Sequence, residues 1–346
     1  MQDQWQTHLQ TFNASFVQGR LSNFGQAEEE IKAAQSGNIM TALASLGHIE
    51  ITGADTVDFL QGQFSNDVKQ VSAAHSQLNA YCTPKGRILT TFRLFAMADH
   101  YYMTLPHELL EGTLKRLRMY VMRSQVTLND ISESWVSIGI AGPDSETHVA
   151  ETLGEIPADI NAVKTVKDIA IIRVPGVKPR FELHGPVDKM IAIWDQLAAR
   201  LTLVGEGVWS HLDIEAGIPT IRAQTAEKFV PQMVNLQAID GLSFKKGCFP
   251  GQEIVARTQY LGKLKKRMYR AHIDTQDTIR AGDELYGADE NNKQSIGTIV
   301  EAQTSPQGGY DVLAVIQITE AENKPVHLHK QDGALLEISE LPYSLD

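Results

Sequence analysis

The hydrophobic periodicity of the chain changes near residue 262, and this change limits the folds that the chain can adopt. Beyond residue 262 the apolar residues fall in short runs separated by clusters of glycine, aspartate, asparagine and proline. Short runs with this punctuation predict the strands of a small β-barrel or β-sandwich. A domain boundary is therefore expected near residue 262. The predicted strands are 267–273, 284–286, 296–302, 312–318 and 335–338.

Before residue 262 the patterns of strands and helices are mixed. A helix predicted to begin at Pro106 has its apolar residues on one face, and a second helix shows the same spacing from Met190 to Leu201,. No repeated parallel unit occurs, so an α+β fold is expected. The ordered part of the chain is expected to begin at Ile49. The predicted strands are 49–52, 88–95, 101–105, 135–140, 169–174 and 181–183.

The length of 346 residues predicts two or three domains,. We expect a polar segment over 1–40, a mixed region over 41–262 and the β-rich region over 263–346. The first segment is rich in glutamine and has neither the basic start nor the apolar stretch of a signal peptide,. The apolar runs are too short to cross a bilayer, and two cysteines are too few for a disulfide framework,. These features favour a cytoplasmic protein that does not enter a membrane.

One of the two cysteines, Cys248, lies in the segment Lys-Lys-Gly-Cys-Phe-Pro-Gly-Gln-Glu. Pro250 and Glu253 are typical of the first turn of a helix, which is expected to end near Gly262. Positive charge and a helix N-terminus both stabilise an anion, so we expect this thiol to ionise readily. The alternative is that Cys248 is a small buried apolar side chain without chemistry. Both cysteines are expected to be free thiols.

The stretch from residue 245 to residue 270 is basic in a chain whose net charge is -11. The overall negative charge disfavours non-specific binding to a phosphate backbone. The local excess of cations predicts either a contact for an anionic cofactor tail or RNA, or a strand edge protected by lysines. The candidate residues are Arg257, Lys263, Lys265, Lys266 and Arg267.

Several common sites are absent from the sequence. It has no Walker loop and no dinucleotide-binding fingerprint,. His327 and His329 flank one leucine, but two histidines on one strand are a weak metal signal by themselves,. We therefore expect no bound metal in the isolated chain.

Five segments together resemble the YgfZ family of bacterial tRNA-modifying proteins. They are residues 59–68 (Phe-Leu-Gln-Gly-Gln-Phe-Ser-Asn-Asp-Val), 209–219, 230–238, 246–253 (Lys-Gly-Cys-Phe-Pro-Gly-Gln-Glu) and 341–345. The resemblance covers nearly everything from about residue 46 to the C-terminus. It implies a T-protein-like fold, with two interleaved α/β folate-binding subdomains and a C-terminal β-barrel. It also implies tetrahydrofolate as cofactor and a role in maintaining the iron-sulfur enzymes that thiolate or methylthiolate tRNA.

The resemblance also assigns cofactor-binding residues. Glu215 matches an acid that holds the pterin in the glycine-cleavage T-protein, and a carboxylate can accept two parallel hydrogen bonds from an aminopyrimidinone edge. Trp209 matches a folate-binding tryptophan whose indole face can stack on the pterin or the aminobenzoyl ring. The alternatives are a helix-surface acid and a core tryptophan. A second folate-binding tryptophan of the family corresponds to Leu46, which removes part of the stacking surface.

A further departure concerns the chemistry of the family. Where the aminomethyltransferase has Gly-Gly-Ile-Ile-Asp-Asp, this chain has Gly-Arg-Ile-Leu-Thr-Thr, ending at Thr90 and Thr91. Threonine cannot carry a negative charge or move a proton at neutral pH, which argues against aminomethyl transfer. At the position of Cys248 the T-protein has no cysteine.

These residues predict a folate-binding accessory protein that is not a transferase. Cys248 is the expected working thiol, Lys246 its activating neighbour, and the motif residues Gly247, Gly251, Gln252 and Glu253 its support. One cysteine cannot supply the four ligands of an iron-sulfur cluster, so any cluster would be shared or transient. The alternatives are a folate-dependent aminomethyltransferase or demethylase, and a protein that binds tRNA directly.

Overall fold

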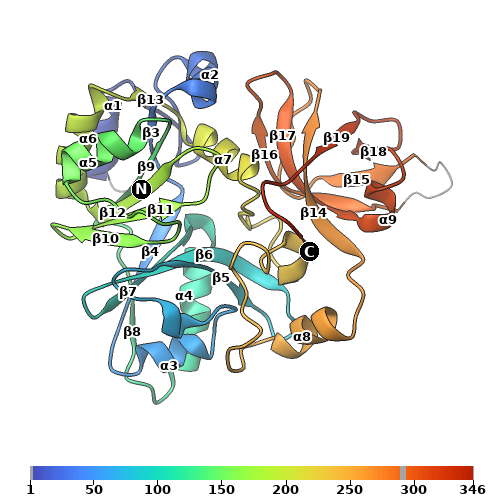
Figure 1. Cartoon of the computed structure of the whole chain (residues 1–346), viewed down its shortest axis with the longest axis horizontal. Coiled ribbons are helices and arrows are strands. Elements are labelled where there is room, and N and C mark those ends of the chain that lie inside the picture. Colours follow the sequence, from blue (N-terminus) through green and yellow to red (C-terminus); the bar gives the residue numbers. More distant parts are fainter. Residues whose placement is uncertain (1–2, 289–293, 346) are drawn as a thin grey trace. The chain divides into compact units, whose positions relative to one another are not determined.

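The computed structural model describes residues 3–288 and 294–345 (Figure 1). Contacts within the chain divide it into two compact units. The first unit contains residues up to Leu60, together with 68–77 and 92–212. The second unit contains 61–67, 78–91 and the residues from Asp213 onward. Each unit is therefore assembled from separate stretches of the sequence.

A six-stranded sheet forms the centre of the first unit. Its strand order is β10-β11-β12-β9-β3-β13, and the only parallel pair among the described residues is β13 with β3. In the β12–β9 register, Arg180 lies opposite Ala141 and His184 lies opposite Ser137. The strands are β3 (Ile39–Ala42), β9 (Trp135–Ala141), β10 (Val163–Val166), β11 (Ile169–Val174), β12 (Arg180–Pro186) and β13 (Thr202–Leu203).

One face of this sheet packs against helices from the N-terminus and from the middle of the chain. The helices are α1 (Asp3–Gln10), α5 (Ser145–Leu153) and α6 (Val187–Ala198). Trp5 of α1 meets Trp194 of α6 edge to face, with ring centroids 5.4 Å apart. Both tryptophans belong to the same buried cluster as Ile138, Phe181 and other inward residues of the sheet.

The expectation that order begins at Ile49 is therefore wrong. The first forty residues form α1, β1 (Ser15–Val17), β2 (Arg20–Asn23), α2 (Ala27–Ser36) and the start of β3. The polar composition of the segment hid a few apolar anchors, of which Trp5 and Leu9 are fully buried. A single buried tryptophan removes enough apolar surface from water to hold a short polar helix in place.

The other face of the same sheet contacts α7 (Glu206–Glu215) through its first-unit residues. Trp209 and Leu212 share a buried cluster with Ala141, Ala170 and Ile172. Side chains alternate along a strand, so this face also carries Arg180, Glu182 and His184 of β12,.

A five-stranded sheet has the order β5-β6-β7-β4-β8. The β6–β7 hairpin turns between Met97 and His100, as predicted, and α4 (His107–Val121) follows it directly with Pro106 as its N-terminal cap. The division between the units passes through β5 and β6. The elements are β4 (Leu46–Thr52), α3 (Thr56–Gln61), the 3₁₀ turn η1 (Val68–Gln70), β5 (Gln77–Cys82), β6 (Ile88–Met97), β7 (His100–Pro106) and β8 (Thr127–Asp130).

The second unit contains the predicted β-rich region. Its six-stranded antiparallel sheet has the order β18-β15-β16-β17-β14-β19, and a backbone bridge between His327 and Leu335 curls the two ends toward each other (Figure 1). The five predicted strands are confirmed as β14 (Lys266–Ile273), β15 (Glu284–Gly287), β16 (Gly297–Thr304), β17 (Tyr310–Gln317) and β19 (Leu336–Ser339). The sequence analysis did not predict β18 (Val326–Leu328) or the short α9 (Ile318–Ala321).

The remaining elements of the second unit are η2 (Pro231–Val234) and α8 (Gln252–Tyr260). Within the described parts of the chain, no helix has the length and the apolar character needed to cross a membrane.

Candidate functional site

The cysteine segment forms a loop that leads into α8. Cys248 is exposed and Cys82 is buried, and both are free thiols as predicted. Burial raises the pKa of Cys82 to about 12, so this thiol is the inert apolar one,. The alternative that Cys248 is a buried side chain is therefore wrong, whereas its chemical role remains a prediction.

The helix after Cys248 begins later than predicted. Its first residue is Gln252 and its N-terminal cap is Gly251, whose φ of 85° lies in the left-handed region. Cys248 therefore lies four residues before the first helical residue, so placing it at the helix start is wrong. The predicted end of the helix near Gly262 is confirmed, because Gly262 N donates to Arg257 O.

Lys246 is turned away from bulk solvent. Its side chain is buried, and its ammonium group donates hydrogen bonds to the backbone carbonyls of Gln61 (2.6 Å) and Phe64. The same nitrogen lies 5.2 Å from the centre of the Phe249 ring. Burial lowers the pKa of Lys246 to about 8, although the charge of Asp67 acts in the opposite direction. The ammonium is therefore held mainly by the loop of residues 61–67.

Several of the family-like segments meet in the second unit. Ser65 of the 59–68 segment donates to Gly241 O (2.8 Å), and its backbone carbonyl accepts from Ser243 N (3.0 Å). In the 230–238 segment, the side-chain amide of Gln232 donates to Val255 O of α8 (2.6 Å), and that of Asn235 donates to Met268 O (3.0 Å). The cysteine loop and α8 are thus fixed to a frame built from motifs far apart in sequence.

The C-terminal segment joins the same frame. The Tyr343 hydroxyl donates to Gly217 O (2.8 Å) and lies 3.4 Å from the Asn235 amide. Gly217 has a positive φ of 66°, and a Cβ at that position would lie 2.6 Å from the Tyr343 ring. The glycine of the Ile-Glu-Ala-Gly segment therefore allows the close approach of the tail.

Glu215 is the last residue of α7 and is half-buried. Its backbone carbonyl accepts a hydrogen bond from Arg270 Nη1 at 3.4 Å. Its carboxylate has no hydrogen bond or ion pair with another described residue. A half-buried carboxylate with both oxygens available can accept hydrogen bonds from a ligand.

Both threonines at the position of the missing aspartates are buried, and both bond to backbone. The Thr91 hydroxyl donates to Pro219 O and accepts from Ile221 N, each at 3.1 Å. The Thr90 hydroxyl donates to Thr91 O at 3.0 Å. These two side chains therefore serve the local fold of the second unit.

Trp209 belongs to the first unit and is only 4% exposed. The guanidinium of Arg180 lies 4.7 Å from the centre of its ring. A Cβ on Gly139 would lie 2.6 Å from Trp209 Cε3, so the absence of a side chain at residue 139 leaves room for the indole. In this structure the indole is packed by protein atoms, with a cation over its face.

Sequence reasoning missed a row of buried polar groups beside Trp209. Glu182 lies 3.4 Å from Arg93 Nε and 3.3 Å from His184 Nε2. Burial alone would raise the pKa of Glu182, but the hydrogen bond with His184 and the charges of Arg93 and Arg180 outweigh it and lower the pKa to about 2. The alternation of polar and apolar residues in β12 predicts that these polar side chains share one face, but it does not show that this face is buried,.

The basic residues after α8 differ in exposure. Arg257, Lys263 and Lys265 are exposed, whereas Lys266 and Arg267 are half-buried. Arg267 is engaged in an ion pair with Glu322 at 3.1 Å. Lys266 and Arg267 occupy the part of β14 that pairs with β17 only, since β19 pairs from Arg270 onward. Lys266 and Arg267 thus fit the alternative of a protected strand edge. The other three cations are exposed, and their contact with an anionic ligand remains a prediction.

Large apolar side chains accompany the three exposed cations. Tyr260 is 69% exposed and Leu261 is 85% exposed, at the end of α8. The Tyr260 ring meets Phe244 edge to face at 5.9 Å. Over residues 3–288 and 294–345, no group of three His, Cys, Asp or Glu side chains could hold a metal ion.

The fold places the chain with the glycine-cleavage T-proteins. It is similar to the crystal structure of glycine cleavage system aminomethyltransferase T from Bartonella henselae, with a TM-score of 0.79 over 97% of this chain and 96% of that chain. The two sequences are 16% identical, so this likeness establishes the fold alone. The T-protein-like α+β fold implied by the sequence motifs is confirmed.

Residues 4–242 match the GCVT N-terminal domain family. The chain is 32% identical to the tRNA-modifying protein YgfZ of Yersinia pseudotuberculosis serotype IB, over 86% of this chain and 90% of that protein. It is 29% identical to the tRNA-modifying protein YgfZ of Colwellia psychrerythraea, over 88% of this chain and 92% of that protein. The chain therefore belongs to the YgfZ family.

Proposed function

We propose that the protein is a folate-binding accessory protein that supports tRNA modification. Its relatives are named tRNA-modifying proteins, and its fold is that of a T-protein. The finer part of the proposal is that it maintains iron-sulfur enzymes that thiolate or methylthiolate tRNA, with Cys248 as the working thiol. The observation that carries this part is an exposed cysteine on a loop whose neighbours are anchored by buried hydrogen bonds.

The structure of the loop supports a role for Cys248 in contact with another molecule. An exposed thiol is not needed for the core, and its reactivity depends on access,. Gly247 also lies in open space, with no atom within 4 Å of where its Cβ would be. The chain thus presents Cys248 on a small local surface while Lys246 anchors the loop from the other side.

Tetrahydrofolate is the cofactor that Glu215 suits. A carboxylate with no partner among the described residues can accept the ring N–H and the exocyclic amine of a pterin, and such charge-assisted bonds are stronger than neutral ones,. Bound folate would supply a carrier for one-carbon units. Trp209 would contribute its indole face only after Arg180 moves, because that cation now covers it.

Binding of tetrahydrofolate can be measured by isothermal titration calorimetry. We expect Glu215→Gln to weaken binding by about 10- to 100-fold, the cost of losing hydrogen bonds to a charged acceptor. Glu337→Gln, which changes an exposed acid on β19, is the matched control and should bind as the wild type does. Absence of binding by the wild type, or equal binding by Glu215→Gln, would contradict the cofactor assignment.

The role of the thiol can be tested in cells that lack their own copy of this protein. We expect Cys248→Ala to lower the fraction of tRNA carrying thiolated and methylthiolated nucleosides, measured by mass spectrometry. Cys82→Ala removes the other cysteine from the core and should leave this fraction unchanged at equal protein level. Full modification with Cys248→Ala would rule out the working thiol, whatever the result with folate.

Aminomethyl transfer is the alternative activity. It is disfavoured because Thr90 and Thr91 stand where the T-protein has carboxylates, and their hydroxyls bond to backbone groups. Purified protein incubated with tetrahydrofolate and a glycine-cleavage amine donor should therefore form no one-carbon adduct. Turnover that is lost in Glu215→Gln would instead establish an enzyme.

Direct contact with tRNA is a second candidate function, favoured by the end of α8. An exposed aromatic ring at Tyr260 stands near the exposed cations Arg257, Lys263 and Lys265, and single-stranded nucleic acids bind to such combinations by stacking and phosphate contacts,. We expect a gel shift with tRNA that weakens as salt rises and that is lost in Lys263→Ala/Lys265→Ala. No shift at low salt would exclude this contact.

A further inference from the structure

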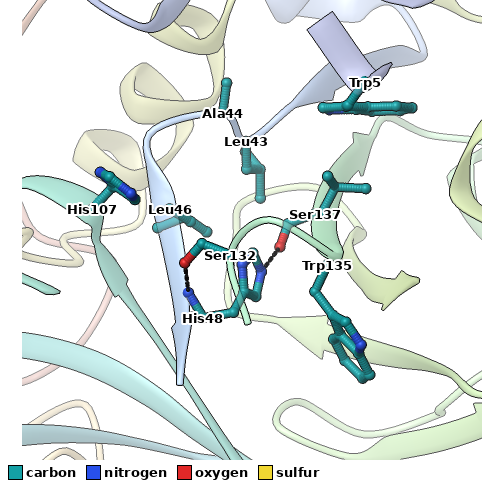
Figure 2. Close-up of a pocket in the computed structure, with 10 residues that line it drawn as sticks. Trp5, Leu43, Ala44, Leu46, His48, His107, Ser132, Trp135 and Ser137 are labelled. Atoms are coloured by element: carbon teal, nitrogen blue, oxygen red, sulfur yellow. Dashed lines mark hydrogen bonds between the residues drawn. The ribbon is translucent and has the colours of Figure 1, made fainter. Parts of the chain in front are cut away.

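A small cavity lies beside β4 in the first unit, and the ring of His48 forms part of its wall (Figure 2). It holds about 20 Å³, which is room for one water molecule,. Most of its lining is apolar, including Leu43, Leu46 and Trp135. His48 is buried, and its Nδ1 has no hydrogen-bond partner among the described residues.

The other ring nitrogen of His48 begins a chain of buried hydrogen bonds. His48 Nε2 lies 2.7 Å from Ser137 Oγ, and Ser137 Oγ lies 2.7 Å from His184 Nδ1. His184 Nε2 in turn lies 3.3 Å from Glu182 Oε2. This series of hydrogen bonds thus runs from the cavity, across strands β9 and β12, to the ion pair of Glu182 with Arg93.

The Glu182 carboxylate at one end of this series determines which group donates and which accepts in each hydrogen bond. An ionised carboxylate only accepts, so His184 Nε2 must carry the proton that is donated to Glu182. A neutral His184 then accepts at Nδ1 from the Ser137 hydroxyl. The oxygen of Ser137 must accept in its turn, and it receives the proton of His48 Nε2. His48 Nδ1 is left as a bare acceptor.

The cations around Glu182 leave no counter-ion for a charge on His184. Arg93 lies 3.4 Å from the Glu182 carboxylate, and the charge of Arg180 also acts on that group. The negative charge of Glu182 is therefore already compensated, and a third cation at His184 would be buried without a counter-ion. Burial lowers the pKa of His48 to about 3, so this ring is neutral at physiological pH.

We propose that the cavity is a binding site for one water molecule, which donates a hydrogen bond to His48 Nδ1. Glu182 acts at a distance as a positioning residue, because it selects the tautomer of His48 through His184 and Ser137. Two arguments support the water. A buried acceptor without a donor is costly, and a polar atom in a cavity of this size is the usual setting for an ordered water.

The tautomer of His48 can be read by long-range proton–nitrogen NMR correlation on protein labelled in histidine. In the wild type we expect a single neutral form with the proton on Nε2, together with a cross-peak between the ring Hε1 and a long-lived water. A wild-type His48 with its proton on Nδ1, or the absence of any water contact, would overturn the proposal.

Two variants test the action at a distance. Glu182→Gln replaces a pure acceptor by a group that can also donate, and Ser137→Ala breaks the chain in the middle. Each should turn the single His48 tautomer into a mixture. Ser132→Ala is the matched control. Ser132 also lines the cavity, but its hydroxyl accepts from the backbone N–H of His48 (3.0 Å) and donates to Asp130 Oδ1 (2.6 Å), so it does not contact the His48 ring and should leave the tautomer unchanged. If Glu182→Gln does not fold, Ser137→Ala alone tests the proposal. An unchanged His48 tautomer in Ser137→Ala would refute the influence of Glu182 through His184 and Ser137.

Discussion

The ammonium group of Lys246 donates a hydrogen bond to the backbone carbonyl of Gln61, with Nζ and the oxygen 2.6 Å apart. The two residues are 185 positions apart in the chain and belong to different family-like segments. The bond ties the cysteine loop to the last residue of α3. Activation of Cys248 by Lys246, which the sequence suggests, remains a prediction, whereas this anchoring role is visible in the structure.

Removal of this anchor should destabilise the protein. Lys246→Met keeps most of the side-chain volume but leaves the carbonyls of Gln61 and Phe64 without their donor. We expect a loss of about 2 kcal/mol in the free energy of unfolding, measured by urea denaturation, because buried acceptors without a partner cost roughly this much. Lys245→Met changes the exposed neighbouring lysine and should have an effect within about 0.5 kcal/mol,. Equal stability of both variants would show that the two bonds are unimportant.

The same lysine should leave a signature in the pH dependence of stability. Burial lowers its pKa to about 8 in the folded state, from 10.5. Between these values the unfolded chain binds a proton that the folded chain has released, so the stability of the wild type should rise with pH across this window. The difference in unfolding free energy between wild type and Lys246→Met should therefore increase from pH 8 to pH 10. If the unfolding free energies of the two proteins change with pH in the same way, the pKa of Lys246 is not lowered in the folded state.

The two glycines of the cysteine segment should respond differently to alanine. Gly251 has a φ of 85°, and a Cβ there would lie 2.5 Å from Gly86 Cα and from Thr83 O. Gly251→Ala should cost about 3 kcal/mol, through backbone strain and overpacking. Gly247→Ala meets open space and should change stability by less than about 0.5 kcal/mol,. The stabilities of the two variants can be compared by thermal unfolding. A Gly251→Ala variant as stable as the wild type would mean that the loop can rearrange.

Local sequence patterns predicted much of this fold because they report local forces. The glycine and proline punctuation after residue 262 identified five strands of the second unit, and the apolar spacing after Pro106 identified α4. The start of α8 was misplaced because Pro250 and Glu253 are typical of a first turn. The close approach of Gly251 to Gly86, which turns the chain before the helix, is a tertiary contact that no local pattern contains.

The buried polar row escaped prediction for a similar reason. In β12, polar residues at 180, 182 and 184 alternate with Phe181 and Leu183, a pattern typical of a strand with one face in water,. In the structure, residues of α7 pack on the polar face as well, and the Arg180 guanidinium lies 4.7 Å from the centre of the Trp209 ring. Burial of Glu182 is tolerated because Arg93 and His184 lie against it. His184 is two residues further along the same strand, but Arg93 comes from a distant part of the sequence, so the ion pair is not visible in the local pattern.

The packing of Trp209 should be sensitive to a single methyl group. A Cβ on Gly139 would lie 2.6 Å from the indole, so Gly139→Ala should destabilise the protein by about 1–3 kcal/mol through overpacking,. The near-ultraviolet circular dichroism of tryptophan should change with it. Gly112→Ala is the matched control, since this exposed glycine of α4 has no atom within 4 Å of its Cβ position and should gain up to about 1 kcal/mol,.

The buried His48 should make the protein lose stability in mild acid. Burial lowers its pKa to about 3, whereas the unfolded chain keeps a value of 6.5. Between these values the unfolded state binds a proton that the folded state refuses, so the free energy of unfolding falls as the pH drops from 6.5 toward 3. Glu182 adds to the loss below pH 4.5, because its folded pKa of about 2 also lies below its ordinary value.

Replacement of His48 separates the two contributions. His48→Gln keeps a side-chain donor toward Ser137 but does not titrate. Its free energy of unfolding should therefore fall less than that of the wild type between pH 6.5 and pH 4.5. The protonation of Glu182 below pH 4.5 should destabilise both proteins. Urea denaturation at a series of pH values measures the difference. His75→Gln, at an exposed position, controls for the removal of a histidine. If His48→Gln and wild type lose stability equally from pH 6.5 to pH 4.5, then His48 takes up its proton in the folded state, and the neutral ring required at the cavity is absent.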